Sequence, residues 1–474
     1  LSFVEFNKSL KGETQMKKRS IFAIIFAVVL AMGLLAGCGG SSTQTTAAAA
    51  GDDAAAAEAA VEEAVAEEAA GGAPASTGSV VKIGYPNPST GALAGHGEGA
   101  EWCIAYFEKF VNEELGGIEM DGEMKTLDII LYDTQSDQST CSEMADKLCV
   151  EDEVDILIGM NTPETAVPVE TKAEQHEVPC VGIQAPVDPC AYANDTSDWH
   201  THAFWTVQSV YDEYQAMWTR AGFGPETKAK VGLAFANDSD GSSWGPLFAE
   251  CAAAVGYEVT FPDLYPSGSN DFSNVVKAFK DADIDILAGT NIPPDFSNLY
   301  TQMISAGVSV EVVTMGKCCL LPGDVEALGD NVEGIMTEVW WQPSYPYTSD
   351  LTGQTGKDVD AAYTADNGRS IPQPTGYSYA ALELAVTALR NAGTTDKKAI
   401  MDAIRALDVT TIVGPIKYDK EMNGMQYAQT VLTGGQWQKA EDGTWKLEVI
   451  DATVFPELEG CITAEYKQGN ATNK

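Results

Sequence analysis

Short runs of apolar residues without alternation recur along the chain from about residue 80, and each is followed by a stretch of helical length. The clearest example lies within residues 155–167, where residues 156–158 predict a parallel strand covered on both faces. Asn161 or Thr162 can cap the helix that follows, with Glu164 in its first turn. Such a turn directs free backbone N–H groups toward the end of the strand, where they favour an anion. An ordinary capped helix of an α/β domain would show the same pattern.

The same alternation of strand and helix occurs in two sets. The first set has expected strands at residues 80–86, 127–132, 156–158 and 178–182, with helices at 100–115, 140–150 and up to 177. The second set has expected strands at 231–236, 258–261 and 284–289, with helices at 244–255, 271–279 and 294–306. We therefore expect an α/β fold with two similar lobes, each a doubly wound and mainly parallel sheet, with ligands bound at the carboxyl edges of the sheets.

The N-terminal residues carry a different pattern. Met16-Lys-Lys-Arg19 precedes an apolar run over residues 21–35, and this order is typical of an export signal. We expect Met16 to be the true start and residues 1–37 to be a signal peptide. Leu35-Ala-Gly-Cys38 resembles the lipobox of bacterial lipoproteins, and this resemblance implies that Cys38 receives lipid. The alternative is a transmembrane anchor, but about fifteen apolar residues are short for a span.

Residues 39–78 consist largely of Ala, Glu, Gly, Ser and Thr and contain no aromatic residue. Such a segment cannot bury a core, so we expect residues 38–79 to be a lipidated cysteine followed by a flexible acidic linker. The rest of the chain, close to 400 residues, is too long for one core and suits two lobes. The formal net charge of −41 argues against nucleic acid or anionic lipid surfaces as partners, and we expect a monomer.

The ten cysteines and four histidines give little support for metal binding or catalysis. The cysteine spacing matches no zinc pattern. A bridge between Cys180 and Cys190 stays open as an alternative to buried free thiols. The sequence has no Gly-rich phosphate loop ending in Lys-Ser or Lys-Thr and no His-Glu-x-x-His motif. Although the abundant Asp and Glu leave a carboxylate pair open, we expect a binding protein with no cofactor or metal.

Several motifs resemble a known family, the type 1 extracytoplasmic solute-binding proteins of amino-acid ABC importers. They include Lys82-Ile-Gly, Asn112-Glu-Glu-Leu-Gly-Gly-Ile118, Tyr132-Asp-Thr-Gln-Ser-Asp-Gln138, Val154-Asp-Ile-Leu-Ile-Gly159 and Gly376-Tyr-Ser-Tyr-Ala-Ala-Leu-Glu383. The resemblance covers nearly all of residues 80–474. It implies capture of a small amino-acid-like or carboxylic ligand between the lobes and delivery to an ABC permease. A receptor of the same fold that serves a membrane sensor is the alternative.

The resemblance also implies the path of the chain. Members of this family cross between the lobes three times through a hinge. Lobe 1 would hold residues 80–203 and 341–407, and lobe 2 would hold residues 204–340 and 408–474.

Binding positions transfer from the family with several departures. In relatives, the loops after the strands at 156–158 and 178–182 hold the ligand's α-carboxylate. The matching residues here are Asn161 and Thr162, then Gln184 and Ala185, followed by a proline that has no N–H to donate.

Four further positions complete the expected site. His96 and Trp244 stand where aromatic residues line the cleft in relatives, although each could instead have a structural role. Asn291 stands where relatives have a tyrosine, and Lys317 stands near the place where they have an acid that holds the α-ammonium. A lysine would repel an ammonium group, so we expect an anionic or aromatic carboxylic compound to bind better than leucine. The rival is that Lys317 points to solvent and Glu164 or another acid takes the ammonium.

Overall fold

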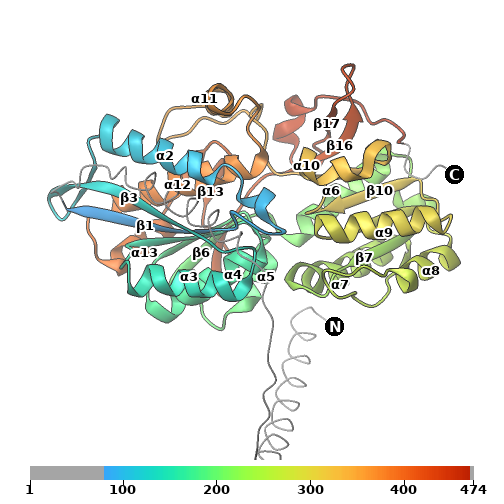
Figure 1. Ribbon diagram of the computed structural model, residues 1–474, viewed down its shortest axis with the longest axis horizontal. Coiled ribbons are helices and arrows are strands. Elements are labelled where there is room, and N and C mark those ends of the chain that lie inside the picture. Colours follow the sequence, from blue (N-terminus) through green and yellow to red (C-terminus); the bar gives the residue numbers. More distant parts are fainter. Residues whose placement is uncertain (1–78, 470–474) are drawn as a thin grey trace, which may run out of the picture. The chain divides into compact units, whose positions relative to one another are not determined.

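The computed structural model describes residues 79–469, apart from the side chain of Ala327. The predicted signal peptide, Cys38 and the predicted linker up to residue 78 lie outside the described residues. Within residues 79–469, none of the helices is both long enough and apolar enough to cross a membrane. This part of the chain forms two α/β lobes, each built on its own large sheet (Figure 1).

The sheet of lobe 1 has eight strands in the order β14-β15-β6-β5-β4-β1-β3-β2. Its central pairs are parallel, whereas β2 and β14 run antiparallel to their neighbours at the two edges. Parallel pairing brings the carboxyl ends of the central strands to one edge. The strands are β1 (Val80–Asn87), β2 (Ile118–Met120), β3 (Glu123–Asp133), β4 (Ile156–Met160), β5 (Cys180–Ile183), β6 (His200–Phe204), β14 (Lys420–Met422) and β15 (Met425–Gln429).

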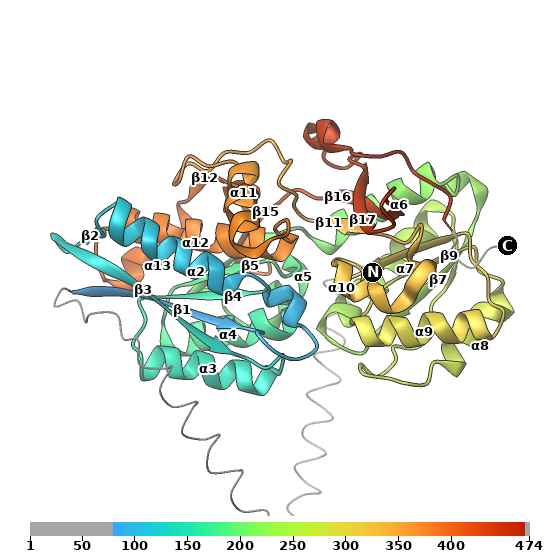
Figure 2. The same cartoon turned by 45° about the horizontal axis from the view of Figure 1, so that its top comes forward.

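Helices cover both faces of this sheet because alternate strand residues face opposite ways. In β4, Ile156 and Ile158 pack in the core with α2 and α12, whereas Leu157 packs in the core with α3 and α4. The two layers of helices are visible in Figures 1 and 2. The helices are α2 (Ala100–Lys109), which continues as a π-helix (Phe110–Glu114), α12 (Gln373–Ala392) and α13 (Lys397–Arg405), then α3 (Gln138–Val150) and α4 (Pro163–His176).

The sheet of lobe 2 has seven strands in the order β17-β16-β11-β10-β9-β7-β8. The five strands from β8 to β11 are parallel, and β16 and β17 add antiparallel pairs at one edge. The strands are β7 (Lys230–Phe235), β8 (Glu258–Thr260), β9 (Ile286–Thr290), β10 (Val312–Gly316), β11 (Met336–Val339), β16 (Thr433–Lys439) and β17 (Trp445–Asp451).

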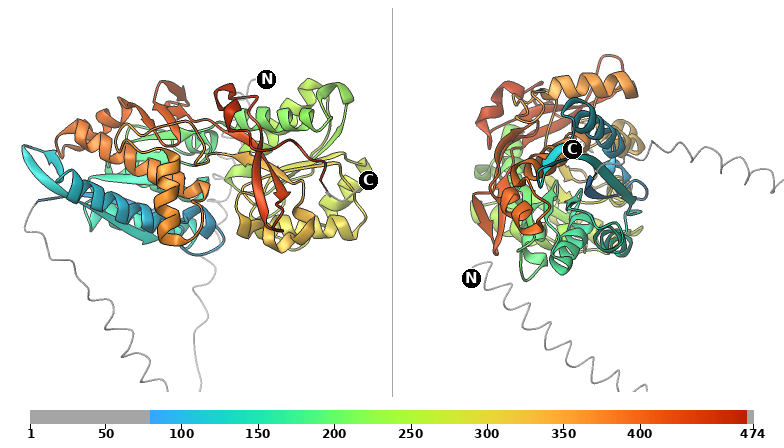
Figure 3. Two further views of the ribbon diagram at one scale, coloured as in Figure 1. Left: turned by 90° about the horizontal axis from the view of Figure 1, so that it is seen from above. Right: turned by 90° about the vertical axis from the view of Figure 1, so that its left-hand side faces the viewer.

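Lobe 2 is covered on both faces in the same way, as the view from above shows (Figure 3). In β9, Ile286 and Ala288 pack in the core with α6 and α7, whereas Leu287 packs in the core with α8 and α9. These helices are α6 (Val207–Arg220), α7 (Ser239–Val255), α8 (Ser273–Ala282) and α9 (Pro293–Ser305).

Short elements complete the two lobes. The α-helices are α5 (Val187–Ala193), α10 (Pro322–Val325) and α11 (Gly356–Asn367), and a small two-stranded sheet consists of β12 (Asp408–Thr411) and β13 (Gly414–Lys417). The 3-10 helices are η1 (Ala94–Gly97), η3 (Pro225–Thr227), η4 (Glu326–Val332) and η5 (Pro456–Cys461).

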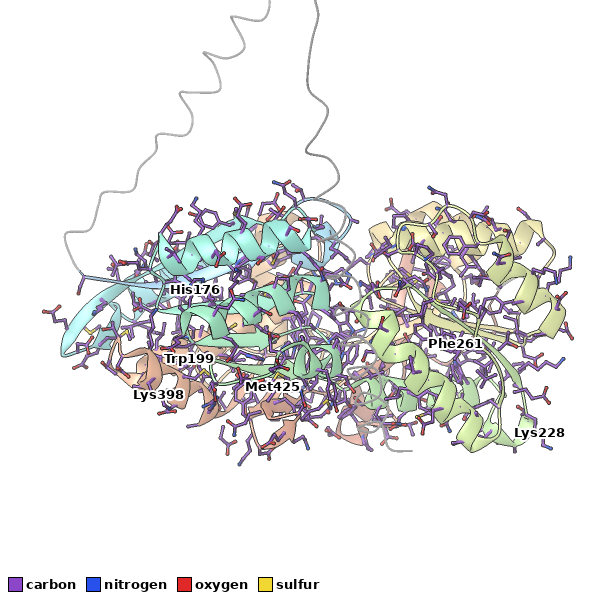
Figure 4. The ribbon with its side chains drawn as sticks, turned by 90° about the horizontal axis from the view of Figure 1, so that it is seen from below. His176, Trp199, Lys228, Phe261, Lys398 and Met425 are labelled. Atoms are coloured by element: carbon purple, nitrogen blue, oxygen red, sulfur yellow. The ribbon has the colours of Figure 1, made fainter. Side chains whose placement is uncertain are left out.

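The chain crosses between the two large sheets three times, after β6, after β11 and after β15. The predicted third crossing at residue 408 is wrong. Residues 420–429 form β14 and β15, and β15 extends the sheet of lobe 1 because Tyr427 pairs with His202 of β6. Figure 4 shows the same placement, since Met425 lies among the elements of lobe 1 together with Trp199. The return to lobe 2 therefore follows Gln429.

The nine cysteines in the described part of the chain are free. Eight are buried and Cys251 is partly exposed. Cys180 lies in β5 and Cys190 lies in α5, so the disulfide left open between them does not form in this structure. The alternative, that most of these cysteines serve as small buried hydrophobes, agrees with their packing in the cores of both lobes.

Candidate ligand-binding site

A cavity lies where the carboxyl ends of the strands of both lobes meet. The space between its lining residues measures about 270 Å³, including solvent at its mouth. The cavity is lined by His96, Asn161, Thr162, Pro163, Gln184, Pro186, Phe204, Trp205, Asp240, Trp244, Thr290, Lys317, Glu338 and Trp340.

Three of these residues have left-handed backbone geometry directly after a strand. Asn161 follows β4 with φ at 89°, Gln184 follows β5 with φ at 67°, and Lys317 follows β10 with φ at 65°. Positive φ is uncommon for residues other than glycine and concentrates at functional sites. These turns place three long polar side chains at the carboxyl edges of the two sheets.

The side-chain amides of Asn161 and Gln184 converge on one carbonyl oxygen. Both donate a hydrogen bond to the backbone oxygen of His96, at 2.8 and 3.3 Å. Because a carbonyl can only accept, this contact orients both NH₂ groups toward His96. Among the described residues, the two buried amide oxygens, Asn161 Oδ1 and Gln184 Oε1, have no hydrogen-bond partner. They are therefore available to a ligand that donates N–H or O–H groups.

His96 lies in η1 and is 5 % exposed. Burial, with the Lys317 ammonium as a second cause, lowers the pKa of its imidazole to about 4, so His96 is neutral at physiological pH. Its ring packs against Trp340, with 5.9 Å between the ring centroids. A neutral histidine adds no charge to the cavity, and its role is that of a polar aromatic wall.

Aromatic side chains form the rest of the wall. Trp205 packs edge-on against Trp244 at 5.4 Å between ring centroids, and Phe204 packs edge-on against Trp340 at 5.4 Å. The indole N–H groups of Trp205, Trp244 and Trp340 are buried, and within the described part of the chain none has an acceptor. Indole can only donate, so these three groups suit the oxygen atoms of a ligand.

Lys317 is the basic residue of the cavity lining, and carboxylates from both lobes surround it. Its Nζ atom lies 2.8 Å from Asp240 Oδ2, 3.1 Å from Glu164 Oε2 and 3.8 Å from Asp238 Oδ2. Glu164 belongs to α4 of lobe 1, whereas Asp238 caps α7 of lobe 2 and Asp240 lies in its first turn. The ion pair between Lys317 and Glu164 therefore joins the two lobes.

The charges of this cluster follow from burial and from mutual attraction. Burial alone would lower the pKa of Lys317, but the three carboxylates outweigh it and raise this pKa, so Lys317 is charged. Burial would raise the pKa of Glu164, but the Lys317 ammonium outweighs it and lowers this pKa. Burial raises the pKa of Asp240 to about 7, although Lys317 opposes the shift. Near neutral pH, the cluster thus holds a charged pair, Lys317 and Glu164, beside Asp240, whose charge changes in this pH range.

The structure brings most of the predicted site residues together. His96, Asn161, Thr162, Gln184, Trp244 and Lys317 all line the cavity. The rival placement of Lys317 in solvent is wrong, because its side chain is 6 % exposed and held by three acids.

Two predicted site residues, Ala185 and Asn291, are not among the lining residues. The Ala185 carbonyl accepts a hydrogen bond from His202 Nε2 at 2.7 Å. The Asn291 side chain is used within lobe 2, where it accepts from the Tyr265 hydroxyl and donates to the Ala234 carbonyl. Both residues therefore form hydrogen bonds within their own lobes and do not line the cavity.

Sequence reasoning missed several lining residues, among them Trp205, Asp240 and Glu338. Trp205 comes directly after β6, where the chain first crosses between the lobes, and that position was a usable signal. Asp240 resembles an ordinary acid in the first turn of a helix. Glu338 lies in β11, where its Oε2 accepts from the Tyr214 hydroxyl at 2.5 Å and burial raises its pKa.

Comparison with known proteins agrees with this architecture. A profile of the periplasmic binding protein family matches residues 80–441. A Leu/Ile/Val-binding protein homolog from Brucella suis biovar 1 is 22 % identical over 386 residues, which cover 79 % of this chain and 91 % of the relative.

Two solved structures show the same fold. One is a leucine binding protein, LivK, from Thermotoga maritima, with a TM-score of 0.65, 19 % identity, and coverage of 79 % of this chain and 99 % of that one. The other is a solute binding protein of an ABC transporter from Rhodopseudomonas palustris in complex with 3,4-dihydroxy benzoic acid, with a TM-score of 0.59, 18 % identity, and coverage of 79 % and 98 %.

Two α/β lobes that enclose a cavity at their strand ends are the architecture of a two-lobed binding protein. Because the family profile spans most of the sequence, the chain belongs to the periplasmic binding protein family. The resemblance to type 1 solute-binding proteins that the motifs indicated is thereby confirmed.

Proposed function

We propose that the protein is an extracytoplasmic receptor that captures a small amino-acid-like or carboxylic solute between its lobes and delivers it to an ABC permease. One observation carries the proposal: a single cavity is lined by strand ends of both lobes and by buried polar groups that, among the described residues, have no partner. Such groups are costly unless a ligand pairs with them, at about 1–3 kcal/mol each. The names of the similar proteins, a Leu/Ile/Val-binding homolog and an ABC transporter component, support the same reading.

We further propose that the protein acts as a lipid-anchored monomer on the outer face of a bacterial cell membrane. The support comes from the sequence, in which an export signal ends at the lipobox-like Leu35-Ala-Gly-Cys38. The segment of residues 39–78 would then act as a tether between the lipid and the two lobes. The partners in this proposal are the membrane-embedded permease and its ATPase subunits.

A thermal-shift screen tests solute capture. The soluble fragment 79–474 is first compared with the full chain to establish that it unfolds at the same temperature. Amino acids, small organic acids, peptides and nucleosides are then added one at a time. A solute at a hundred times its dissociation constant adds about 2.7 kcal/mol to the free energy of unfolding. A screen in which every solute leaves the melting temperature unchanged would contradict the proposal.

Two variants distinguish binding in the cavity from binding at another surface. Trp244→Ala removes a wall of the cavity, whereas Trp445→Ala removes a partly exposed tryptophan at the far edge of the lobe 2 sheet. A solute bound in the cavity loses its stabilising effect in the first variant and keeps it in the second.

A further inference from the structure

The positive charge in the ligand cavity is the ammonium group of Lys317. Lys317 donates to Glu164 and Asp240 at 3.1 and 2.8 Å, and Asp238 lies within ion-pair distance. Two of the three hydrogens of the ammonium group are donated to Glu164 and Asp240, and Asp238 adds a further negative neighbour at 3.8 Å. Lys317 and Asp240 are 6 % and 3 % exposed, so water screens their interaction weakly.

This arrangement is unfavourable for a ligand that carries its own ammonium group. A second ammonium at these acids would lie beside the Lys317 ammonium, at a separation where like charges repel strongly in a buried site. His96, the other titratable base of the cavity lining, is neutral. Glu338 is paired with the Tyr214 hydroxyl. Each acid of the cavity lining thus has one carboxylate oxygen paired within the protein before any ligand arrives.

The remaining polar groups suit a ligand with neutral donors and with oxygen acceptors. Asn161 Oδ1, Gln184 Oε1 and Asp240 Oδ1 are buried acceptors without a partner in the described chain. A hydroxyl group can satisfy such oxygens without adding positive charge beside Lys317. The indole N–H groups of Trp205, Trp244 and Trp340 are buried donors that also have no partner in the described chain, and they suit a carboxylate or carbonyl oxygen.

The aromatic lining of the cavity points to a flat ligand. Three tryptophans and Phe204 form much of its wall. Aromatic rings favour contact with other rings, face to edge or offset. A ligand with an aromatic ring can make such contacts, whereas a branched aliphatic chain cannot.

We propose that the ligand is an aromatic hydroxy acid without an amino group, and that Lys317 takes the place that the ammonium of an amino acid would occupy. This inference rests on the proposed function, since it names the solute class for the same cavity. In it, the ligand hydroxyl donates to the amide oxygens of Asn161 and Gln184, and the carboxylate accepts from indole N–H groups.

The test uses two molecules that differ only in the amino group, L-tyrosine and desaminotyrosine, which is tyrosine without that group. Calorimetric titration of the wild-type protein should show desaminotyrosine binding at least about tenfold more tightly than tyrosine. Tyrosine that binds equally well or better would overturn the inference.

Lys317→Met gives the complementary result. It removes the ammonium and keeps an unbranched side chain, so the acids become free for a ligand cation. Tyrosine should gain affinity and desaminotyrosine should lose it, each by about tenfold. The control is Lys439→Met, which breaks a half-exposed pair with Asp330 in lobe 2 and should leave the preference unchanged. If Lys317→Met does not fold, Lys317→Gln serves in its place, and circular dichroism reports folding for both.

The outcomes separate this inference from the proposed function. Binding of tyrosine in preference to desaminotyrosine, or binding of another solute while neither tyrosine nor desaminotyrosine binds, overturns the ligand class and leaves solute capture supported. Failure of every solute in the thermal-shift screen overturns both. An unchanged preference in Lys317→Met overturns the assigned role of Lys317 even when the wild type prefers desaminotyrosine.

Discussion

Lys317 of lobe 2 and Glu164 of lobe 1 form an ion pair with 3.1 Å between Nζ and Oε2. Glu164 lies in the first turn of α4, whose positive dipole end also favours its carboxylate. The pair joins the lobes at the cavity. We therefore expect this contact to break when the lobes open for a solute to enter.

The aromatic wall predicts a fluorescence signal and a loss of affinity. Ligand in the cavity should change the tryptophan emission, because three tryptophans line it. Trp244→Ala should weaken binding by about 2–4 kcal/mol, as expected for a buried aromatic contact residue. Titration followed by emission and by calorimetry measures both effects. Unaltered affinity in Trp244→Ala would place the ligand elsewhere.

Glu383 predicts a pH-dependent stability. It is 2 % exposed in α12, and burial raises its pKa to about 8 from an ordinary value of 4.5. Since the folded state keeps the proton that the unfolded state loses, this contribution is present below pH 4.5 and is lost as the pH rises to about 8. Glu383→Gln stays uncharged and should remove this dependence. Urea unfolding at pH 5 and pH 9 measures the free energy of unfolding of both proteins. Relative to the wild type, the variant should be more stable at pH 9 than at pH 5 by on the order of 3–5 kcal/mol. An equal loss of stability in both proteins between pH 5 and pH 9 would contradict the assignment.

A buried pair behind the cavity predicts non-additive stability. His202 contacts Glu170 at 2.7 Å, and both side chains are fully buried. His202→Leu would leave a buried carboxylate without its partner, at a cost of about 3–5 kcal/mol. Adding Glu170→Met should recover much of this loss because the unpaired charge is removed.

Urea unfolding of the two single variants and the double variant measures this coupling. The control is His176→Leu, which breaks a half-exposed pair with Asp146 and should cost no more than about 1 kcal/mol. A double variant whose loss equals the sum of the single losses would show that the two residues are not coupled.

The sequence predicted the lobes better than the site. Unbroken apolar runs such as residues 156–158 mark strands covered on both faces, and that pattern depends only on local residues. The third crossing was misplaced because β14 and β15 are short and carry a polar, half-exposed pattern, so nothing local assigns them to lobe 1. Their placement depends on pairing between residues more than 200 positions apart, as for Tyr427 and His202.

Site residues that directly follow a strand could be predicted from the sequence. Site residues whose position depends on contacts between distant parts of the chain could not. Asn161 and Gln184 each follow a predicted strand, and the family resemblance placed Lys317, so the position of all three at the cavity could be foreseen. The partners of Lys317 could not, because Asp240 lies 77 positions earlier in the chain and Glu164 lies 153 positions earlier. Only the packed structure shows that this lysine is neutralised within the cavity.

The proposed anchor predicts a change of location without loss of binding. Cys38→Ser removes the proposed lipid attachment, so the protein should leave the membrane fraction while its ligand affinity stays the same. Detergent-phase partitioning and calorimetry of the released protein measure these properties. Continued partitioning of the signal-cleaved variant into detergent would contradict the anchor.

The central claim is that a solute is captured between the lobes, and small-angle X-ray scattering tests it most directly. The ligand-binding fragment 79–474 is measured without ligand and at calorimetric saturation. Because both lobes contribute lining residues, binding should draw them together and the radius of gyration should fall. A radius of gyration that stays constant while calorimetry reports full occupancy would contradict capture between the lobes.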